Sequence, residues 1–81
     1  MMRDRYYVRF EKIMKPYRTV IDEWRNHQFN LPQNERDYSH ESMIRWFEEK
    51  HNILYSVNAN GVIKLGFASV QDVTLFALRM S

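Results

Sequence analysis

Residues 53–80 have the sequence ILYSVNANGVIKLGFASVQDVTLFALRM, and this stretch decides the fold class. Asn60-Gly61 is a preferred pair for a two-residue hairpin loop, because both central residues of a type I′ turn must take a positive φ. The runs on either side alternate with period two, as strands with one buried face do. The sequence therefore predicts a β-hairpin closed at Asn60-Gly61.

The predicted pairing assigns the hairpin residues to two faces. With the loop at Asn60-Gly61, the side chains expected on the core face are Leu54, Ile63, Leu65 and Phe67. The opposite face is expected to be at least partly open and carries Tyr55, Val57 and Lys64. Moving the loop back by one residue, to Ala59-Asn60, leaves both faces unchanged, since every residue keeps its side of the pleat.

The chain before the hairpin predicts one strand and two helices. Residues 5–13 alternate between apolar and polar side chains, which is typical of a half-buried strand. Pro16 suits the first turn of a helix over residues 16–28, whose apolar side chains follow helical spacing. After a polar connection, Ser39 is the expected N-cap of a second helix, and Asn52 is a plausible left-handed end.

The chain after the hairpin fits two structures. We favour a short helix over residues 70–76, capped by Ser69, that leads into a terminal strand. The whole chain, residues 1–81, is then one α+β domain with a small antiparallel or mixed sheet and helices on one face. Its order is the ferredoxin-like βαββαβ with a doubled first helical crossover. If the last segment is wholly helical, the fold has a three-stranded sheet and three helices.

The composition limits the possible functions. The 81 residues carry a formal net charge of +2 and no cysteine, so disulfides, thiolate metal sites and thiol catalysis are excluded. No apolar run approaches about eighteen residues, so we expect no membrane partner, and the cytoplasm is the simplest compartment. A chain this short buries only about 60% of its unfolded surface. A partner or a second copy would therefore help its stability.

No motif for catalysis or metal binding is present in the sequence. The three histidines make no H-x-x-x-H pair, which would place two metal ligands on one face of a helix. No serine lies in a G-x-S-x-G turn, and two glycines are too few for a loop that cradles phosphate. We therefore expect a protein that is not an enzyme and that has no cofactor and no metal.

The aromatic residues point to a binding surface. The chain has five Tyr, five Phe and two Trp, more than so small a core can bury. The residues predicted to bind a partner on the open sheet face are Arg5, Tyr7, Arg9, Tyr55, Val57 and Lys64. Such a face suits a protein partner or a second copy, where aromatic residues and arginine are enriched. It also suits nucleic acid, through base stacking and phosphate contacts.

The C-terminal segment FASVQDVTLFALRM resembles the ending of small accessory proteins of tailed bacteriophages. The matching positions are Phe67, Asp72, Phe76 and Leu78. The resemblance implies a phage-encoded protein that binds host or phage macromolecules. We therefore expect a small, non-enzymatic binding protein that acts on host or phage machinery through a protein interface. We expect it to form a homodimer through the open sheet face or an edge strand.

Three alternatives remain. The first is an RNA or single-stranded DNA binder that uses the basic, aromatic sheet face. The second is an oligomer that sequesters a nucleotide at a subunit interface. The third follows from the order strand, helix, helix, antiparallel strands, which is similar to that of small ribosome-dependent endoribonuclease toxins. Those toxins need a basic cluster on the sheet, whereas this hairpin offers only Lys64, with Arg79 at the end of the chain.

Overall fold

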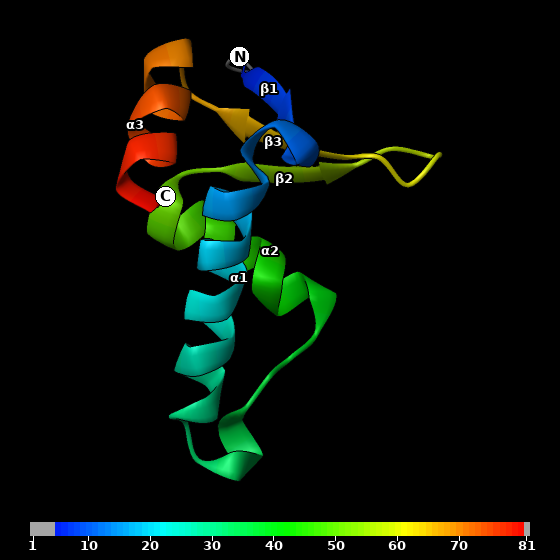
Figure 1. Ribbon diagram of the computed structural model, residues 1–81. Coiled ribbons are helices and arrows are strands. Elements are labelled where there is room, and N and C mark those ends of the chain that lie inside the picture. Colours follow the sequence, from blue (N-terminus) through cyan, green and yellow to red (C-terminus); the bar gives the residue numbers. More distant parts are fainter. Residues whose placement is uncertain (1–4, 81) are drawn as a thin grey trace.

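The computed structural model describes residues 5–80, which form an α+β fold (Figure 1). Its strands are β1 (Tyr6–Arg9), β2 (Leu54–Val57) and β3 (Ile63–Phe67), which form one antiparallel sheet in the order β1-β3-β2. Its α-helices are α1 (Met14–Phe29), α2 (His40–His51) and α3 (Val70–Met80). Two short 3-10 turns are η1 (Phe10–Ile13) and η2 (Gln33–Glu35). The predicted α+β class is confirmed.

The described part of the last segment, Val70–Met80, is one helix, so the predicted terminal strand is wrong and the alternative of a three-stranded sheet with three helices is confirmed. The helix α3 replaces that strand, and the ferredoxin-like βαββαβ order is not confirmed, because the described residues supply three strands rather than four. The predicted cap is present, since the Ser69 hydroxyl accepts the Asp72 N–H at 3.3 Å. Helical spacing turns Phe76 onto Phe67, with ring centroids 5.4 Å apart. This packing buries an aromatic residue, which explains why the helix continues.

Both predicted ends of the second helix are confirmed. The Ser39 hydroxyl accepts the Ser42 N–H at 3.2 Å and caps α2, and Asn52 ends this helix with a φ of 54°. The start of α1 differs slightly from the prediction, because β1 ends at Arg9 and η1 leads directly into the helix at Met14. The predicted strand over residues 5–13 is therefore only four residues long.

The hairpin has a three-residue loop, which shifts the predicted pairing by one residue. The Asn58 N–H donates to the Val62 carbonyl at 3.1 Å, and the Gly61 N–H donates to the Asn58 carbonyl at 3.0 Å. Gly61 takes the left-handed conformation, with a φ of 79°. A turn followed by a left-handed glycine is the usual form of a three-residue loop. The observed partners are Tyr55 with Leu65 and Val57 with Ile63, so every β2 side chain points to the face opposite the predicted one.

Packing against the helices explains the shift. The Tyr55 ring lies 5.4 Å from that of Phe47 and 6.3 Å from that of Tyr17, on the face that the helices cover. Its hydroxyl group forms a 3.0 Å hydrogen bond with that of Tyr17. The predicted core positions Leu65 and Phe67 are buried as expected, and Ile63 is partly buried beside them. Leu54 was predicted in the core and instead lies on the opposite face of the sheet.

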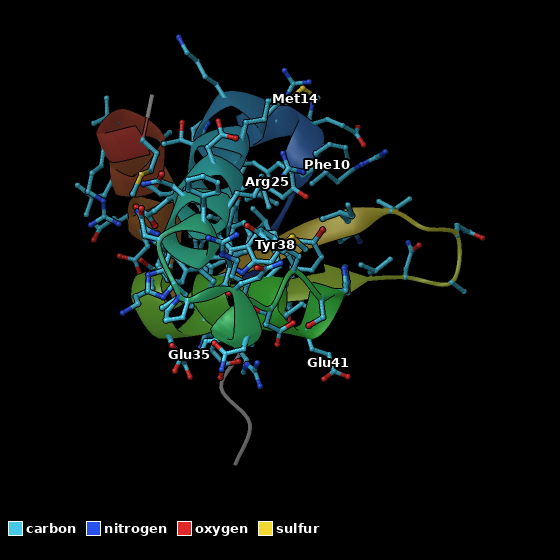
Figure 2. The ribbon with its side chains drawn as sticks, turned by 90° about the horizontal axis from the view of Figure 1, so that it is seen from below. Phe10, Met14, Arg25, Glu35, Tyr38 and Glu41 are labelled. Carbon is cyan, nitrogen blue, oxygen red and sulfur yellow. The ribbon has the colours of Figure 1, made fainter. Side chains whose placement is uncertain are left out.

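The helix α2 and the beginning of α1 lie against one face of the sheet, the rest of α1 extends away from it, and α3 lies beside it (Figure 1). The core between them consists of Ile13, Val20, Trp24, Met43, Phe47, Ile53, Leu65, Phe67 and Phe76. Seen from below, the tip of the β2–β3 hairpin extends past the helices (Figure 2). Val57 lies near this tip, which explains why it is exposed although it points to the helical side. Among residues 5–80, no helix combines the length and apolar character that crossing a bilayer requires.

Candidate binding surface

The sheet surface opposite the helices is the candidate binding surface, and we call it the outer face. Its residues are Tyr7, Arg9, Leu54, Ser56, Lys64 and Gly66, which share one side by alternation and by cross-strand pairing. They form two rows across the three strands. One row contains Tyr7, Gly66 and Leu54, and the other contains Arg9, Lys64 and Ser56.

The ring of Tyr7 lies over Gly66 at the centre of the first row. A Cβ atom added to Gly66 would lie 2.7 Å from Cε1 of Tyr7, closer than any real contact. The missing side chain therefore lets the ring lie against the backbone of β3, and the ring in turn covers the glycine. Tyr7 remains 49% exposed, so part of this aromatic side chain is available to a ligand.

The second row places two cations side by side. Arg9 and Lys64 are direct cross-strand partners between β1 and β3, an arrangement in which like charges repel. The Arg9 guanidinium is partly neutralised by Glu11, at 3.2 Å, and both side chains of this ion pair are about half exposed. Lys64 forms no ion pair within residues 5–80. The row therefore carries net positive charge.

Arg5 lies just before β1 and links it to the end of α2. Its Nη1 donates to the Asn52 carbonyl at 3.0 Å, and its Nη2 donates to the Asn52 side-chain oxygen at 3.4 Å. Asn52 has the left-handed conformation that ends α2, so Arg5 holds this turn against the sheet. The guanidinium thus has a structural partner and also contributes a positive charge near the first row.

The structure brings some of the predicted binding residues together and separates others. Tyr7, Arg9 and Lys64 lie on the outer face, and Arg5 lies just before β1. Tyr55 and Val57 lie on the opposite side, which corrects the predicted surface. The pattern of the sequence does not predict Leu54 and Ser56 on this face, nor the contact between Tyr7 and Gly66. The signal was Ala59-Asn60-Gly61, which fits a three-residue loop with glycine at its last position as well as a two-residue loop.

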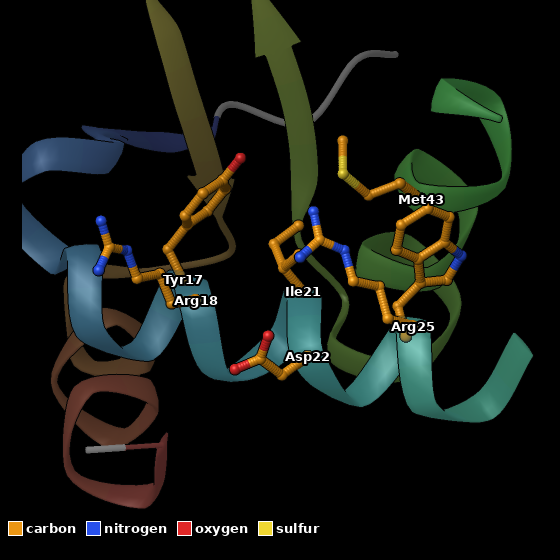
Figure 3. A pocket seen from close by; sticks show the side chains of 7 residues that line it. Tyr17, Arg18, Ile21, Asp22, Arg25 and Met43 are labelled. Atoms are coloured by element: carbon orange, nitrogen blue, oxygen red, sulfur yellow. The ribbon is translucent and has the colours of Figure 1, made fainter. Parts of the chain in front are cut away.

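An open cavity of about 500 Å³ lies along α1, next to the start of α2 (Figure 3). Its lining residues are Tyr17, Arg18, Ile21, Asp22, Trp24, Arg25 and Met43. Figure 3 shows the Asp22 carboxylate between the side chains of Arg18 and Arg25 along α1. The acid offsets part of the positive charge, and the cavity brings together no pair of groups suited to acid–base catalysis.

A cluster of polar side chains joins α1 to α2. Glu23 Oε1 accepts the indole N–H of Trp46 at 2.9 Å and lies 2.7 Å from Nε2 of His51. The His51 side chain is only 7% exposed, and its Nδ1 is buried without a hydrogen-bond partner among the described residues. The contacts of Glu23 with Trp46 and His51 connect the two helices.

Residues 5–80 contain no group of three or more acidic or histidine side chains placed to hold a metal ion. Comparisons with protein-family models, curated proteins and solved structures find no significant match.

Proposed function

We propose that the chain is a non-enzymatic binding protein whose outer face binds single-stranded nucleic acid. The observation that carries this proposal is the cross-strand pair Arg9–Lys64 next to the exposed ring of Tyr7. Aromatic rings that stack on bases, flanked by cations that contact phosphate, are the usual parts of such a surface.

The charges support an anionic ligand. Two cations held opposite each other repel in the free protein, and a phosphate bound between them would relieve that repulsion. Because Gly66 has no side chain, the ring of Tyr7 can lie over the backbone of β3 on the outer face. Stacking of one base on such a ring contributes about 1–3 kcal/mol. A strand of four residues is about 14 Å long, so the outer face would hold two or three nucleotides.

The expectation of a host or phage protein partner, drawn from the phage resemblance, stays a prediction. It rested partly on Tyr55 and Val57, and both point away from the outer face. Without them, the outer face has one large aliphatic side chain, Leu54, beside its cations. That composition favours a charged polymer over a dry protein interface.

Fluorescence anisotropy with labelled single-stranded RNA and DNA oligonucleotides tests the proposal. We expect binding at about 50 mM salt that weakens steeply toward about 300 mM, because phosphate contacts release counterions. Tyr7→Ala should weaken binding by about tenfold, whereas Tyr7→Phe should retain it, since the ring does the stacking. Lys64→Gln should weaken binding and reduce the salt slope by about one.

Two matched variants serve as controls. Tyr38 is exposed to a similar extent, 52%, but lies in the connection before α2, and Lys50 lies on α2. Neither belongs to the outer face, so Tyr38→Ala and Lys50→Gln should leave the affinity unchanged. The proposal fails if the wild-type chain binds neither oligonucleotide at low salt, or if the control variants lose as much affinity as Tyr7→Ala and Lys64→Gln.

A further inference from the structure

The helix α3 is apolar on two sides. Its inner side packs on the core through Val73, Phe76 and Met80. Its outward side has a second row at positions i, i+3, i+4 and i+7, which we call the outer stripe and which consists of Gln71, Thr74, Leu75 and Leu78. Leu75 is 62% exposed and Leu78 is 72% exposed. Two leucines on successive turns thus form an apolar surface on the outside of the molecule.

The other two helices do not have such a surface. The outward side of α1 carries Lys15, Arg18, Asp22 and Arg25, and that of α2 carries Glu41, Arg45, Glu48 and Glu49. A helix side that faces water normally has charged side chains, whereas the outer stripe has none and exposes two leucines. The outer stripe is therefore expected to have an occupant.

The charges beside the outer stripe indicate what the occupant is. Asp72 and Arg79 are seven residues apart on α3, so they lie on the same flank of the stripe, about 10 Å apart along the axis. The acid is in the first turn and the arginine in the last. Neither side chain has an ion-pair partner within residues 5–80. The flank thus carries one charge of each sign, near opposite ends.

This pattern is self-complementary in one orientation only. When two identical helices face each other antiparallel about a two-fold axis, the same flank of both lies on the same side of the interface, with opposite ends adjacent. Asp72 of each copy then lies near Arg79 of the other copy, so the interface has two such pairs. In a parallel pair, the axis places the charged flank of one helix on the side away from that of its partner, and the charges do not meet.

We infer that two copies of the chain associate through α3, antiparallel, with Leu75 and Leu78 at the centre and Asp72 paired with Arg79 of the second copy. This interface differs from the predicted dimer contact through the open sheet face or an edge strand, which stays a prediction, and it leaves the outer face free. It goes beyond the proposed nucleic-acid binding and does not depend on it. A second copy also suits a chain of 81 residues, which has a small core of its own.

Light scattering coupled to size exclusion tests the dimer with the full chain. The monomer mass is 10.0 kDa, so we expect twice that value at high concentration and a shift toward the monomer on dilution. Leu75→Asp should give a folded monomer, because a buried carboxylate at the centre of the interface has no partner. Val57→Asp is the matched control at an exposed apolar residue outside α3, and it should stay dimeric.

Exchanging the charges tests the orientation. Asp72→Arg and Arg79→Asp should each weaken dimerisation by about tenfold or more, since like charges then meet across the interface. The double variant should restore it, because the pairs re-form with opposite sign. Far-ultraviolet circular dichroism checks that each variant is folded. A monomer at all concentrations, or a dimer that Leu75→Asp leaves intact, overturns the proposal. A dimer in which the double variant fails to recover overturns the antiparallel arrangement.

Discussion

The Glu23 carboxylate lies 2.7 Å from Nε2 of His51, and this contact joins the middle of α1 to the last residue of α2. The same oxygen accepts the indole N–H of Trp46 at 2.9 Å, so one carboxylate on α1 contacts two side chains of α2. His51 also packs edge-on against Phe76 of α3, with ring centroids 6.1 Å apart. The histidine is therefore fixed by three helices at once.

Glu23→Ala should destabilise the fold by about 1–3 kcal/mol, because it leaves a largely buried imidazole and an indole N–H without their shared acceptor. Asp22→Ala is the matched control. It removes the neighbouring acid on the same helix, which has no ion pair or hydrogen bond within residues 5–80, and should change stability by less than about 0.5 kcal/mol. Urea unfolding measures both variants. Equal stability of the two would show that the Glu23 contacts contribute nothing.

Tyr55 should make the protein sensitive to alkali. Burial, and then the hydrogen bond to Tyr17, raise the pKa of Tyr55 above its ordinary value of 10.0. The folded state therefore keeps this proton at a pH where the unfolded chain has lost it. The contribution to stability is complete below pH 10.0 and decreases as the pH rises above that value.

Melting temperatures measured between about pH 8 and pH 11.5 test this expectation. The wild-type protein should lose stability above about pH 10, and Tyr55→Phe should show a shallower decline because it cannot ionise there. Tyr38→Phe removes an exposed hydroxyl group and should follow the wild-type curve. An alkaline decline that is identical in all three proteins would contradict the assignment to Tyr55.

Gly61 should be the residue of the hairpin loop most sensitive to substitution. Its φ of 79° is costly for a residue with a Cβ, so Gly61→Ala should destabilise by about 1 kcal/mol. Gly61→Asn should cost less, because asparagine tolerates the left-handed region. The free space around its Cβ position means that the difference comes from the backbone alone. Chemical denaturation of the two variants gives the comparison, and equal losses would contradict the backbone explanation.

Asn58 supports the same loop from its side chain. Its Oδ1 accepts the Asn60 N–H at 2.8 Å and the Val62 N–H at 3.0 Å. These two bonds fix a three-residue loop, and with it the pairing of β2 with β3. The side chain that determines the register is therefore present in the sequence. It competes there with the strong two-residue signal of Asn60-Gly61.

Local signals and distant contacts explain which predictions succeeded. Ser39, Asn52 and Ser69 act within a few residues of the helix ends that they determine, so the sequence alone predicts them. The facing of β2 depends on Tyr55 packing against Tyr17, 38 residues earlier. The pairing of Glu23 with His51 spans 28 residues. Residues this far apart do not form a local sequence pattern, so neither contact can be predicted from one.

The same distinction holds for the outer face. Tyr7 and Arg9 were placed correctly because β1 alternates cleanly, and Lys64 because the buried neighbours Leu65 and Phe67 determine the facing of β3. The facing predicted for Tyr55 and Val57 is wrong because it follows from a two-residue loop at Asn60-Gly61, whereas the loop has three residues and shifts the pairing by one.

The contact between Tyr7 and Gly66 makes Gly66 sensitive to substitution by alanine. Gly66→Ala should displace the Tyr7 ring, since the new Cβ would lie 2.7 Å from Cε1, and it should destabilise the fold by about 1 kcal/mol. In a Tyr7→Ala background the same change meets no ring. It should then stabilise the strand by about 0.5–1 kcal/mol, because alanine loses less backbone entropy than glycine.

The four proteins form a double-mutant cycle, measured by chemical denaturation, with an expected coupling of about 1–2 kcal/mol between the two positions. Additive effects would mean that the ring does not lie over Gly66 in solution. The cycle also bears on binding, because Gly66→Ala keeps the tyrosine and every charge of the outer face and changes only where the ring lies. If Tyr7 stacks on bases from this position, Gly66→Ala should weaken oligonucleotide binding nearly as much as Tyr7→Ala does. It should weaken binding no further in the Tyr7→Ala background.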